Sequence, residues 1–309
     1  MIYDIVIIGG GPAGMTAALY ARRNGRTVLV IEKSGFGGQI THAPRVENYP
    51  GIASMTGNEF GDRLMSQILD HGADIEFETV TSVRWENGSG FIVETEEGTV
   101  HEGRSVILAT GVKHRQLQLA GENELTGSGV SYCAVCDGDF FSGQEVCVAG
   151  GGNSALQDAL LLAQKCRKVT ILQDLPELTG EKTLQDRVQQ KDNITVLTNV
   201  HINALLQDDS RLTGVEISEN GAIRSITCDG LFVAIGLLPD NQPFEQLAKL
   251  NAWGYFDSDE TCLTKTPGVF VAGDCRSKAI RQLTTAVGDG ATASLAACRY
   301  LDSIIQESR

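Results

Sequence analysis

The chain has 309 residues, a length that predicts about two domains. Hydrophobic residues make up 42% and charged residues 21%, a balance typical of globular proteins that excludes a disordered or fibrous chain. The 25 basic and 39 acidic residues give a net charge of −14. Because an acidic surface repels nucleic acid and anionic lipid, we expect neither as a partner.

The N-terminal segment has the features of neither a signal peptide nor a membrane span. Its uncharged run 5–21 follows Asp4 and is broken by Gly9-Gly10-Gly11-Pro12, whereas a signal peptide begins with basic residues and a transmembrane helix needs about 20 apolar ones. Of the eight cysteines, only Cys133 and Cys136 are close in sequence, which is not a disulfide framework. We therefore expect a cytoplasmic protein without membrane contact.

The first predicted elements are a strand, a glycine-rich turn and a helix. The β-branched run 4–8 predicts the strand, Gly9-Gly10-Gly11-Pro12-Ala13-Gly14 the turn, and an Ala-rich pattern the helix. A second strand over 27–31 is followed by Glu32, 21 residues after Gly11. This is the spacing of a dinucleotide-binding βαβ unit, in which the acid accepts hydrogen bonds from a ribose.

The same pattern recurs in the middle of the chain. A strand over 145–149 precedes Gly150-Gly151-Gly152-Asn153-Ser154-Ala155, a helix to about residue 164 and a strand over 168–172. One such fingerprint alone can be a ligand-free turn, but two copies within βαβ patterns favour two dinucleotide-binding domains. The small residues permit the tight turn, the approach of backbone N–H groups to a pyrophosphate, and close helix packing; they are Gly9, Gly11 and Gly14, then Gly150, Gly152 and Ala155.

Further glycine-rich loops and strands that end in small residues suit contact with a large planar ligand. They are Ser34-Gly35-Phe36-Gly37-Gly38-Gln39, Val106-Ile107-Leu108-Ala109-Thr110-Gly111 and Gly268-Val269-Phe270-Val271-Ala272-Gly273-Asp274. Together with Val46-Glu47-Asn48-Tyr49-Pro50-Gly51 and Arg281-Gln282-Leu283-Thr284-Thr285-Ala286, they resemble the low-molecular-weight thioredoxin reductases over essentially the whole chain.

The resemblance implies an α/β fold with two Rossmann-like dinucleotide-binding domains, the second inserted in the first. An FAD-binding domain would comprise 1–113 and 242–309, and the inserted NAD(P)-binding-like domain would comprise 114–241. Glu32 would bind the adenosine ribose of FAD, and Asp274 its ribityl or pyrophosphate part. The implied FAD contacts are Gly9, Gly11, Pro12, Ala13, Gly14, Glu32, Lys33, Gly38, Gln39, Asn48, Val80, Ala109, Thr110, Gly111, Gly273, Asp274, Arg281, Gln282, Leu283 and Ala286.

Cys133-Ala134-Val135-Cys136-Asp137 is the most informative segment for chemistry. Two cysteines at this spacing can close a small disulfide, and a thiolate in such a motif is redox-active. The alternatives are an inert pair or half of a zinc site. Zinc would need a second Cys or His pair at ligand spacing, but Cys147 lies in an apolar strand and the five histidines are dispersed. We therefore expect redox activity and no metal.

The resemblance also implies roles for these residues. Cys136 matches the thiol that exchanges electrons with FAD, and Cys133 matches the thiol that attacks the disulfide of a thioredoxin-like substrate. Asp137 matches the acid/base that moves a proton to or from the thiols. The resemblance further implies a homodimer. A solvated loop carboxylate or a helix N-cap is the alternative interpretation of Asp137.

The electron donor is the point at which the chain departs from the family pattern. NADPH-binding members carry His-Arg-Arg and a further Arg after the second strand of the inserted domain, where this chain has Gln173-Asp174-Leu175-Pro176-Glu177-Leu178-Thr179. A carboxylate repels a 2′-phosphate but accepts hydrogen bonds from a free 2′-hydroxyl. NADPH is therefore disfavoured, and candidate contacts of NADH are Gly150, Gly152, Asn153, Ser154, Ala155 and Asp174.

Reduced ferredoxin is the other candidate donor, because some flavoproteins of this type that lack the basic motif accept electrons from it. The expected function is transfer of two electrons from a soluble donor, through FAD and the Cys133/Cys136 pair, to a thioredoxin-type disulfide. A flavin-bound redox sensor that does not turn over is an alternative. A ferredoxin–nicotinamide reductase is another, and it would work without the cysteine pair.

Overall fold

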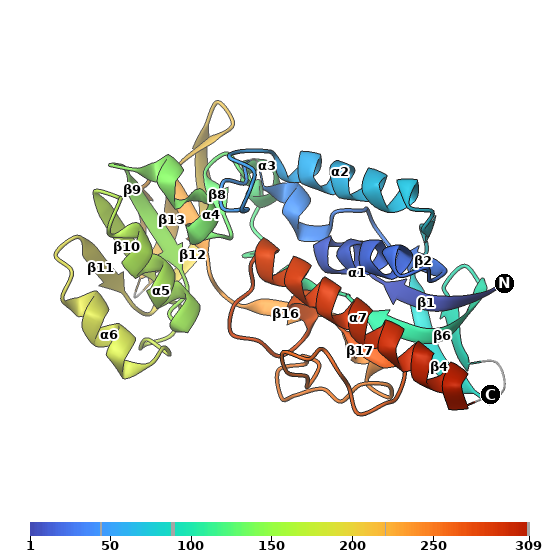
Figure 1. The fold of residues 1–309 in the computed structure, drawn as a ribbon. Coiled ribbons are helices and arrows are strands. Elements are labelled where there is room, and N and C mark those ends of the chain that lie inside the picture. The colour runs from blue at the N-terminus through green and yellow to red at the C-terminus, as the bar shows by residue number, and fades with distance from the viewer. Residues whose placement is uncertain (44, 88–89, 220, 308–309) are drawn as a thin grey trace. The chain divides into compact units, whose positions relative to one another are not determined.

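Each predicted glycine fingerprint directly follows a strand that pairs in parallel with its neighbours. The computed structural model describes residues 1–43, 45–87, 90–219 and 221–307, and the chain divides into two units. Unit 1 comprises Met1–Lys113 and Leu238–Arg309, and unit 2 comprises His114–Leu237 (Figure 1). The chain passes between them along two paired strands, β7 (Val112–His114) and β16 (Leu237–Pro239).

Residues 238–241, which we expected in the inserted domain, belong to unit 1. The reason is Asn241, which is fully buried and donates hydrogen bonds to the carbonyl oxygens of Gly254 and Cys275, both at 2.9 Å. Its side-chain oxygen accepts a hydrogen bond from Thr110 Oγ1 at 2.7 Å. These contacts join the returning chain to unit 1 as soon as it leaves β16.

The sheet of unit 1 has the order β3-β2-β1-β6-β5-β4, and β17 also pairs with β6. Its elements are β1 (Ile2–Ile8), α1 (Pro12–Arg23), β2 (Val28–Ile31), η1 (Gly38–His42), α2 (Gly57–Asp70), β3 (Asp74–Glu76), β4 (Val80–Glu86), β5 (Gly90–Thr95), β6 (Val100–Leu108), η3 (Gln242–Phe244), β17 (Val269–Val271), η4 (Gly273–Cys275) and α7 (Leu283–Glu307). In the parallel part, Ile8 pairs with Ile31 and with Leu108. The carboxyl ends of these strands, and the loops that follow them, therefore meet at one edge.

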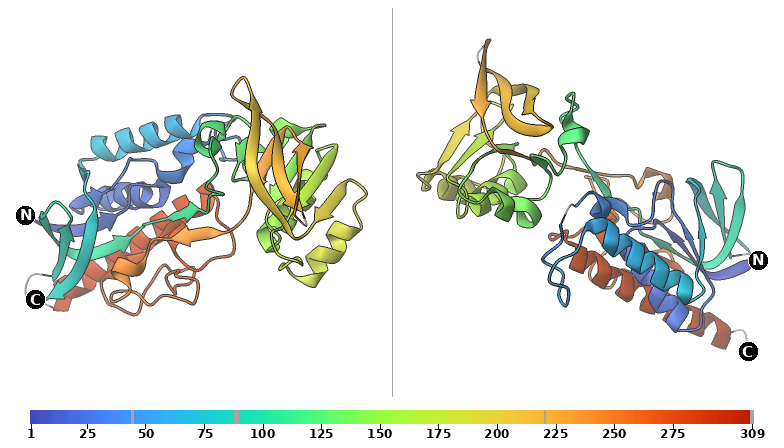
Figure 2. Two further views of the ribbon diagram at one scale, coloured as in Figure 1. Left: turned by 180° about the vertical axis from the view of Figure 1, so that it is seen from behind. Right: turned by 90° about the horizontal axis from the view of Figure 1, so that it is seen from above.

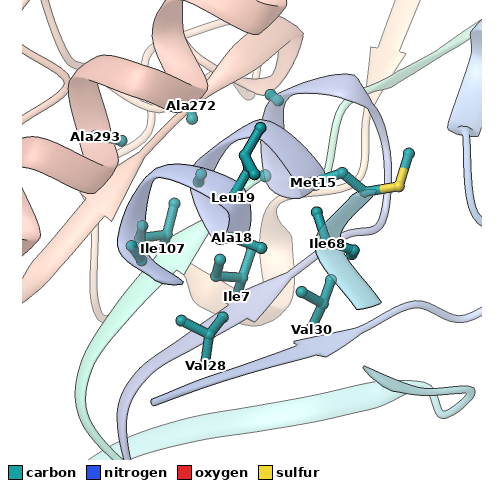
Figure 3. Packing of buried hydrophobic residues seen from close by; sticks show 14 of the residues in the cluster. Ile7, Met15, Ala18, Leu19, Val28, Val30, Ile68, Ile107, Ala272 and Ala293 are labelled. Atoms are coloured by element: carbon teal, nitrogen blue, oxygen red, sulfur yellow. The ribbon is translucent and has the colours of Figure 1, made fainter. Parts of the chain in front are cut away.

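Three helices cover one face of this sheet. Figures 1 and 2 show α1 beside both α2 and α7. Figure 3 shows their apolar cluster, in which Ile7 and Val28 of the sheet lie against Ala18 of α1. The helices approach closely because small residues lie at the contacts: a Cβ on Gly290 of α7 would collide with the carbonyl oxygen of Ala13. This packing holds the first turn of α1 beside β1.

Unit 2 contains a parallel sheet of order β11-β10-β9-β15-β8 and an antiparallel sheet β12-β13-β14, golden to orange in Figure 1. Its elements are α3 (Glu122–Leu125), β8 (Val130–Ser131), α4 (Ala134–Asp137), η2 (Gly138–Phe141), β9 (Glu145–Ala149), α5 (Asn153–Leu162), β10 (Lys168–Leu172), α6 (Lys182–Gln189), β11 (Ile194–Leu197), β12 (Val200–Asp208), β13 (Arg211–Glu219), β14 (Ala222–Thr227) and β15 (Gly230–Val233). Helices α5 and α6 contribute to one apolar cluster, and β12 and β13 to another. Two Rossmann-like domains are thus confirmed. Across the described residues, no helix has the length and apolar composition needed to cross a membrane.

Candidate active site

The predicted cysteine pair is a disulfide at the start of α4 in unit 2. Cys133 and Cys136 are bonded, with their Cα atoms 5.2 Å apart. Cys133 is the N-cap of this short helix, and the backbone N–H of Cys136 donates to the Cys133 sulfur at 3.2 Å. Both cysteines are half-buried, and Val135 between them is 52% exposed. The disulfide therefore lies at the surface of unit 2, where thiol exchange is sterically feasible.

Asp137 follows directly and is largely buried. Its Oδ2 accepts a hydrogen bond of 2.6 Å from the Ser131 hydroxyl, while its Oδ1 is buried without a partner among the described residues. Burial raises the pKa of Asp137, and the hydrogen bond from Ser131 partly offsets that rise. A carboxyl with a raised pKa is suited to act as an acid/base near neutral pH. The solvated loop carboxylate considered above does not fit this position.

Ser131 also connects Asp137 with the disulfide. Its hydroxyl oxygen accepts a hydrogen bond from the Cys133 backbone N–H at 3.1 Å. Ser131 is 3% exposed at the end of β8, so the strand holds the hydroxyl at one position. We did not predict a role for Ser131 from the sequence. Its short spacing before the cysteine pair is the only sequence signal, and that signal is weak.

The other six cysteines are buried and free. Cys147 lies in β9, as its apolar surroundings predicted. In the described part of the chain, no group of three or more His, Cys, Asp or Glu side chains is arranged as a metal site. Among the eight cysteines, the disulfide pair Cys133 and Cys136 is therefore the one expected to carry the chemistry.

The first fingerprint forms a tight turn between β1 and α1 in unit 1. Gly9 has a φ of 109°, and a Cβ there would meet the carbonyl oxygen of Ala109. A Cβ on Gly14 would collide with the carbonyl oxygen of Gly9. At Gly11, by contrast, a Cβ would contact nothing within 4 Å. The space above Gly11, at the start of the 12-residue helix α1, fits a phosphate group bound by backbone N–H groups.

Glu32 lies at the carboxyl end of β2 beside this turn. One carboxylate oxygen accepts from the Gly10 N–H at 2.7 Å, and the other accepts from the N–H and the hydroxyl of Ser34. A carboxylate offers about four acceptor positions, so these three donors leave room for a ribose hydroxyl. The binding of a ribose by Glu32 stays a prediction that this geometry permits.

Two distant segments reach the same turn. A Cβ on Gly38 would lie 3.2 Å from the Gly11 Cα, and a Cβ on Gly273 would lie 2.8 Å from the Ala13 Cβ. Asp274 follows Gly273, and its Oδ1 is buried without a partner among the described residues. Burial raises the pKa of Asp274. A buried acceptor that lacks a donor in the protein fits a ligand hydroxyl, as FAD would supply.

The remaining predicted contacts are distributed around unit 1. Asn48 Nδ2 donates to Gln282 Oε1 at 3.3 Å, and the Arg281 side chain donates to the Asp274 carbonyl oxygen at 3.2 Å. Thr110 is bonded to Asn241, and Lys33 is paired with Asp240. The other positions are placed as follows: Pro12 opens α1, Gln39 is exposed in η1, Val80 begins β4, Ala109 and Gly111 follow β6, Leu283 begins α7, and Ala286 is buried in α7.

The second fingerprint has the same geometry in unit 2. Gly150 has a φ of 117°, and a Cβ there would lie 2.5 Å from the carbonyl oxygen of Ala234. Gly152 precedes α5, and the Thr179 hydroxyl is 3.7 Å from where its Cβ would be. Asn153 exchanges two hydrogen bonds with Glu181. Ser154 and the fully buried Ala155 continue the first turn of α5.

The loop 173–181 folds over this second turn. The N–H groups of Thr179 and Gly180 donate to the carbonyl oxygen of Gly151, both at 2.9 Å. Gln173 is 3% exposed, and its side chain donates to the Glu177 carbonyl oxygen at 3.2 Å, which closes the loop. Asp174 is exposed beside a cavity of about 300 Å³ that Asn199, His201 and Ser218 also line. No Lys or Arg is present in 173–181.

The geometry of a redox disulfide and two dinucleotide turns agrees with the comparisons to known proteins. The model of the pyridine nucleotide-disulphide oxidoreductases matches residues 3–290. The chain belongs to this family. Within it, the chain is 39% identical to the thioredoxin reductase of Listeria monocytogenes over 305 residues, 98% of this chain and 95% of the relative. It is 36% identical to the thioredoxin reductase of Bacillus subtilis, with 98% and 96% covered.

A solved structure of thioredoxin reductase from Streptococcus pyogenes has a TM-score of 0.92 and 37% identity, covering 98% of this chain and 99% of that one. The resemblance to the low-molecular-weight thioredoxin reductases is thereby confirmed. This member of the pyridine nucleotide-disulphide oxidoreductases is an FAD-dependent disulfide oxidoreductase, which confirms the expected class of enzyme.

Proposed function

We propose that this oxidoreductase transfers two electrons from NADH, through FAD and the Cys133/Cys136 pair, to the disulfide of a thioredoxin-type protein. The observation that carries the proposal is the disulfide at the surface of unit 2, followed directly by the buried carboxyl of Asp137. A flavin-bound sensor without turnover would need no acid/base beside its disulfide. A ferredoxin–nicotinamide reductase would need no cysteine pair.

FAD fits the residues of unit 1. The open space at Gly11 and the unpartnered Oδ1 of Asp274 support binding there. Ala13 and Gly14 would donate backbone N–H groups to the pyrophosphate, Glu32 would accept from the adenosine ribose, and Asp274 would accept from a hydroxyl of the ribityl chain. When bound, FAD would supply the two-electron chemistry that connects the donor with the disulfide.

The two cysteines then carry out the thiol–disulfide exchange with the substrate. Once reduced, Cys133 as a thiolate attacks the substrate disulfide, forms a mixed disulfide and releases one substrate thiolate. Cys136 attacks the Cys133 sulfur, re-forms the internal disulfide and releases the second substrate thiolate. Two electrons and two protons reach the substrate in total. Asp137, held by Ser131, supplies and recovers the proton that accompanies these steps.

The charge at the end of β10 supports NADH as the donor. Asp174 is exposed where a nucleotide ribose would lie, and Glu177 adds a second negative charge to the same loop. A free 2′-hydroxyl can donate to a carboxylate, whereas a 2′-phosphate would be repelled. The second turn repeats the backbone geometry of the first, with a φ of 117° at Gly150 and 109° at Gly9, which supports retained nucleotide binding. No observation of the site favours ferredoxin.

Anaerobic stopped-flow mixing tests the donor. The purified yellow protein is mixed in turn with NADH, NADPH and reduced ferredoxin, and flavin absorption is followed. We expect rapid bleaching by NADH and slow bleaching by NADPH. Rapid reduction by NADPH would refute the charge argument, and reduction by ferredoxin alone would mean that electrons enter from a protein donor.

A second assay tests the substrate class. With the best donor, a thioredoxin should be reduced with a higher kcat/KM than a small aromatic disulfide, because the exposed Val135 and the half-buried cysteines offer a docking surface as well as a reactive bond. Equal or lower specificity for thioredoxin would contradict this assignment. Sedimentation of the same sample tests the homodimer that the family resemblance implies.

A further inference from the structure

One carboxylate on α7 holds the segment 273–282, which contains four of the expected FAD contacts. Asp289 Oδ2 accepts hydrogen bonds from the Gly273 N–H at 3.0 Å, Arg276 Nε at 2.8 Å and Lys278 Nζ at 2.9 Å. Its Oδ1 accepts from Arg276 Nη2 at 2.8 Å. Arg276 is 1% exposed, so the bidentate pair is shielded from water. Asp289 thus fixes both main chain and side chains of the segment.

The same contacts leave Asp274 available. Its buried Oδ1 has no partner among the described residues, although Lys278 and Arg281 both act electrostatically on this carboxyl. The Lys278 ammonium donates to Asp289. An unpaired buried acceptor is costly, and a neighbouring lysine would satisfy it unless another group held that lysine. Asp289 is the group that does so.

Arg281 extends the arrangement toward the end of the segment. It donates to the carbonyl oxygens of Asp274 at 3.2 Å and of Arg276 at 3.3 Å, and its guanidinium lies 4.2 Å from the centre of the Tyr255 ring. Because Arg281 binds the carbonyl oxygens of the residues on either side of Cys275, its position depends on the main chain that Asp289 holds. The expected contacts at Gly273, Asp274 and Arg281 therefore share one anchor.

We propose that Asp289 is a positioning residue for flavin binding: it anchors the segment 273–282 and retains Lys278, so that the Asp274 oxygen is free to accept a hydrogen bond from a hydroxyl of FAD. The inference rests on the proposed binding of FAD at Asp274. It names a residue that is not among the expected FAD contacts.

Titration of the flavin-free protein with FAD, followed by quenching of flavin fluorescence, tests the proposal. Asp289→Asn should raise the dissociation constant roughly tenfold or more, because Lys278 is released to pair with Asp274. Adding Lys278→Met to Asp289→Asn should recover much of the affinity. The matched control is Asp302→Asn, which also removes an acid from α7 and breaks the ion pair of Asp302 with Arg26. This variant should change the dissociation constant by less than about twofold.

Thermal unfolding of each flavin-free variant separates positioning from general stability. The proposal is overturned if Asp289→Asn binds FAD as the wild type does, if the affinities of the variants simply follow their stabilities, or if Lys278→Met gives no recovery. If Asp289→Asn does not fold, Asp289→Glu keeps the charge and displaces the carboxylate, and an unchanged dissociation constant in that variant would also overturn it. A wild-type protein that binds no FAD would instead refute the proposed function.

Discussion

Asp137 illustrates how a few atoms prepare a carboxyl for proton transfer. Burial raises the pKa of Asp137, and the Ser131 hydroxyl, which partly offsets that rise, donates to one carboxylate oxygen and also accepts from the N–H of Cys133. The hydroxyl therefore couples the orientation of the acid to the backbone of the disulfide. The other carboxylate oxygen has no donor among the described residues, so the proposed mechanism assigns it the proton exchange with a thiol when the disulfide is open.

Asp137→Asn should lower kcat for disulfide reduction about 100-fold or more, because the variant cannot transfer a proton, while the flavin stays bound. Ser131→Ala removes a hydrogen bond that lowers the pKa of Asp137, so the limb of the pH–rate profile that reports this group should move to higher pH. Steady-state assays from pH 5 to 9 measure both effects. The exposed Ser142 provides the control Ser142→Ala; an identical profile for Ser131→Ala and wild type would contradict the coupling.

Cys133→Ser and Cys136→Ser should each abolish disulfide reduction and leave FAD bound, since neither cysteine belongs to the FAD turn. Absorption spectra should distinguish the two variants: the family resemblance places Cys136 next to the flavin, so only Cys133→Ser retains a thiolate able to perturb the flavin bands. The buried Cys166 provides the control Cys166→Ser, which should retain turnover. Turnover by either active-site variant would exclude the dithiol mechanism.

At the scale of elements, α5 follows the second glycine turn and carries a half-buried acid, Asp158. Asp158 lies in the second half of this 10-residue helix, and burial raises its pKa to about 7. The folded protein thus binds the proton more tightly than the unfolded chain, whose carboxyl has a pKa near 3.8. The resulting contribution to stability is fully present below pH 3.8 and is lost as the pH rises to about 7.

Asp158→Asn should therefore raise the free energy of unfolding at pH 8, by about 2–4 kcal/mol, and by much less at pH 5. Urea unfolding of the flavin-loaded protein at the two pH values measures the difference. The control Asp186→Asn removes an exposed acid from α6 that pairs with Lys182, and its effect should be within about 0.5 kcal/mol. The free energy of unfolding of the wild type, relative to that of Asp158→Asn, should decline between pH 5 and pH 8. If it does not, burial of the charged Asp158 carboxylate has no measurable cost and the expectation is wrong.

The loop between β10 and α6 is the element that we expect to select the donor. Asp174→Arg with Thr179→Arg should improve NADPH binding about tenfold or more, because each new cation can contact the 2′-phosphate. Gln173 is retained, since its side chain closes the loop by donating to Glu177. Flavin reduction rates at varied NADPH concentration measure the effect. Asp192→Arg, which makes a similar charge change outside the loop, should give no gain; an equal gain there would indicate a general charge effect.

At the scale of the whole molecule, the two units differ in what a bound flavin should stabilise. The predicted FAD contacts all lie in 1–113 and 238–309. FAD at about 100 times its dissociation constant should therefore stabilise unit 1 by about 2.7 kcal/mol. Hydrogen exchange of flavin-free and flavin-loaded protein should show this gain in β1, β2 and α1 and little change in β9, β10 and α5. Increased protection confined to β9, β10 and α5 would instead place the flavin in unit 2 and contradict the assignment.

Short windows of sequence are enough to predict the two βαβ units and the cysteine pair. Apolar strands, glycine turns and Ala-rich helices recur with local periods, and the structure has β1 and β2 within about two residues of the expected bounds. The spacing of Glu32 from Gly11 places the acid beside the turn because parallel strands end at one edge. The family resemblance, through loops such as Ser34–Gln39, then adds the FAD domain formed by two distant segments.

Contacts between residues far apart in sequence account for the rest. Asn241 bonds with Thr110, 131 positions away, and thereby moves the boundary of unit 2 to Leu237. Gly38 and Gly273 reach Gly11 and Ala13 from opposite ends of the chain. Asp289 lies in a segment with an ordinary helical pattern, which does not distinguish it from other helical acids. The sequence separations between Asp289 and its partners Gly273, Arg276 and Lys278 match no helix or strand period. Such contacts depend on how helices and sheets pack, and packing leaves no local pattern that a single sequence displays.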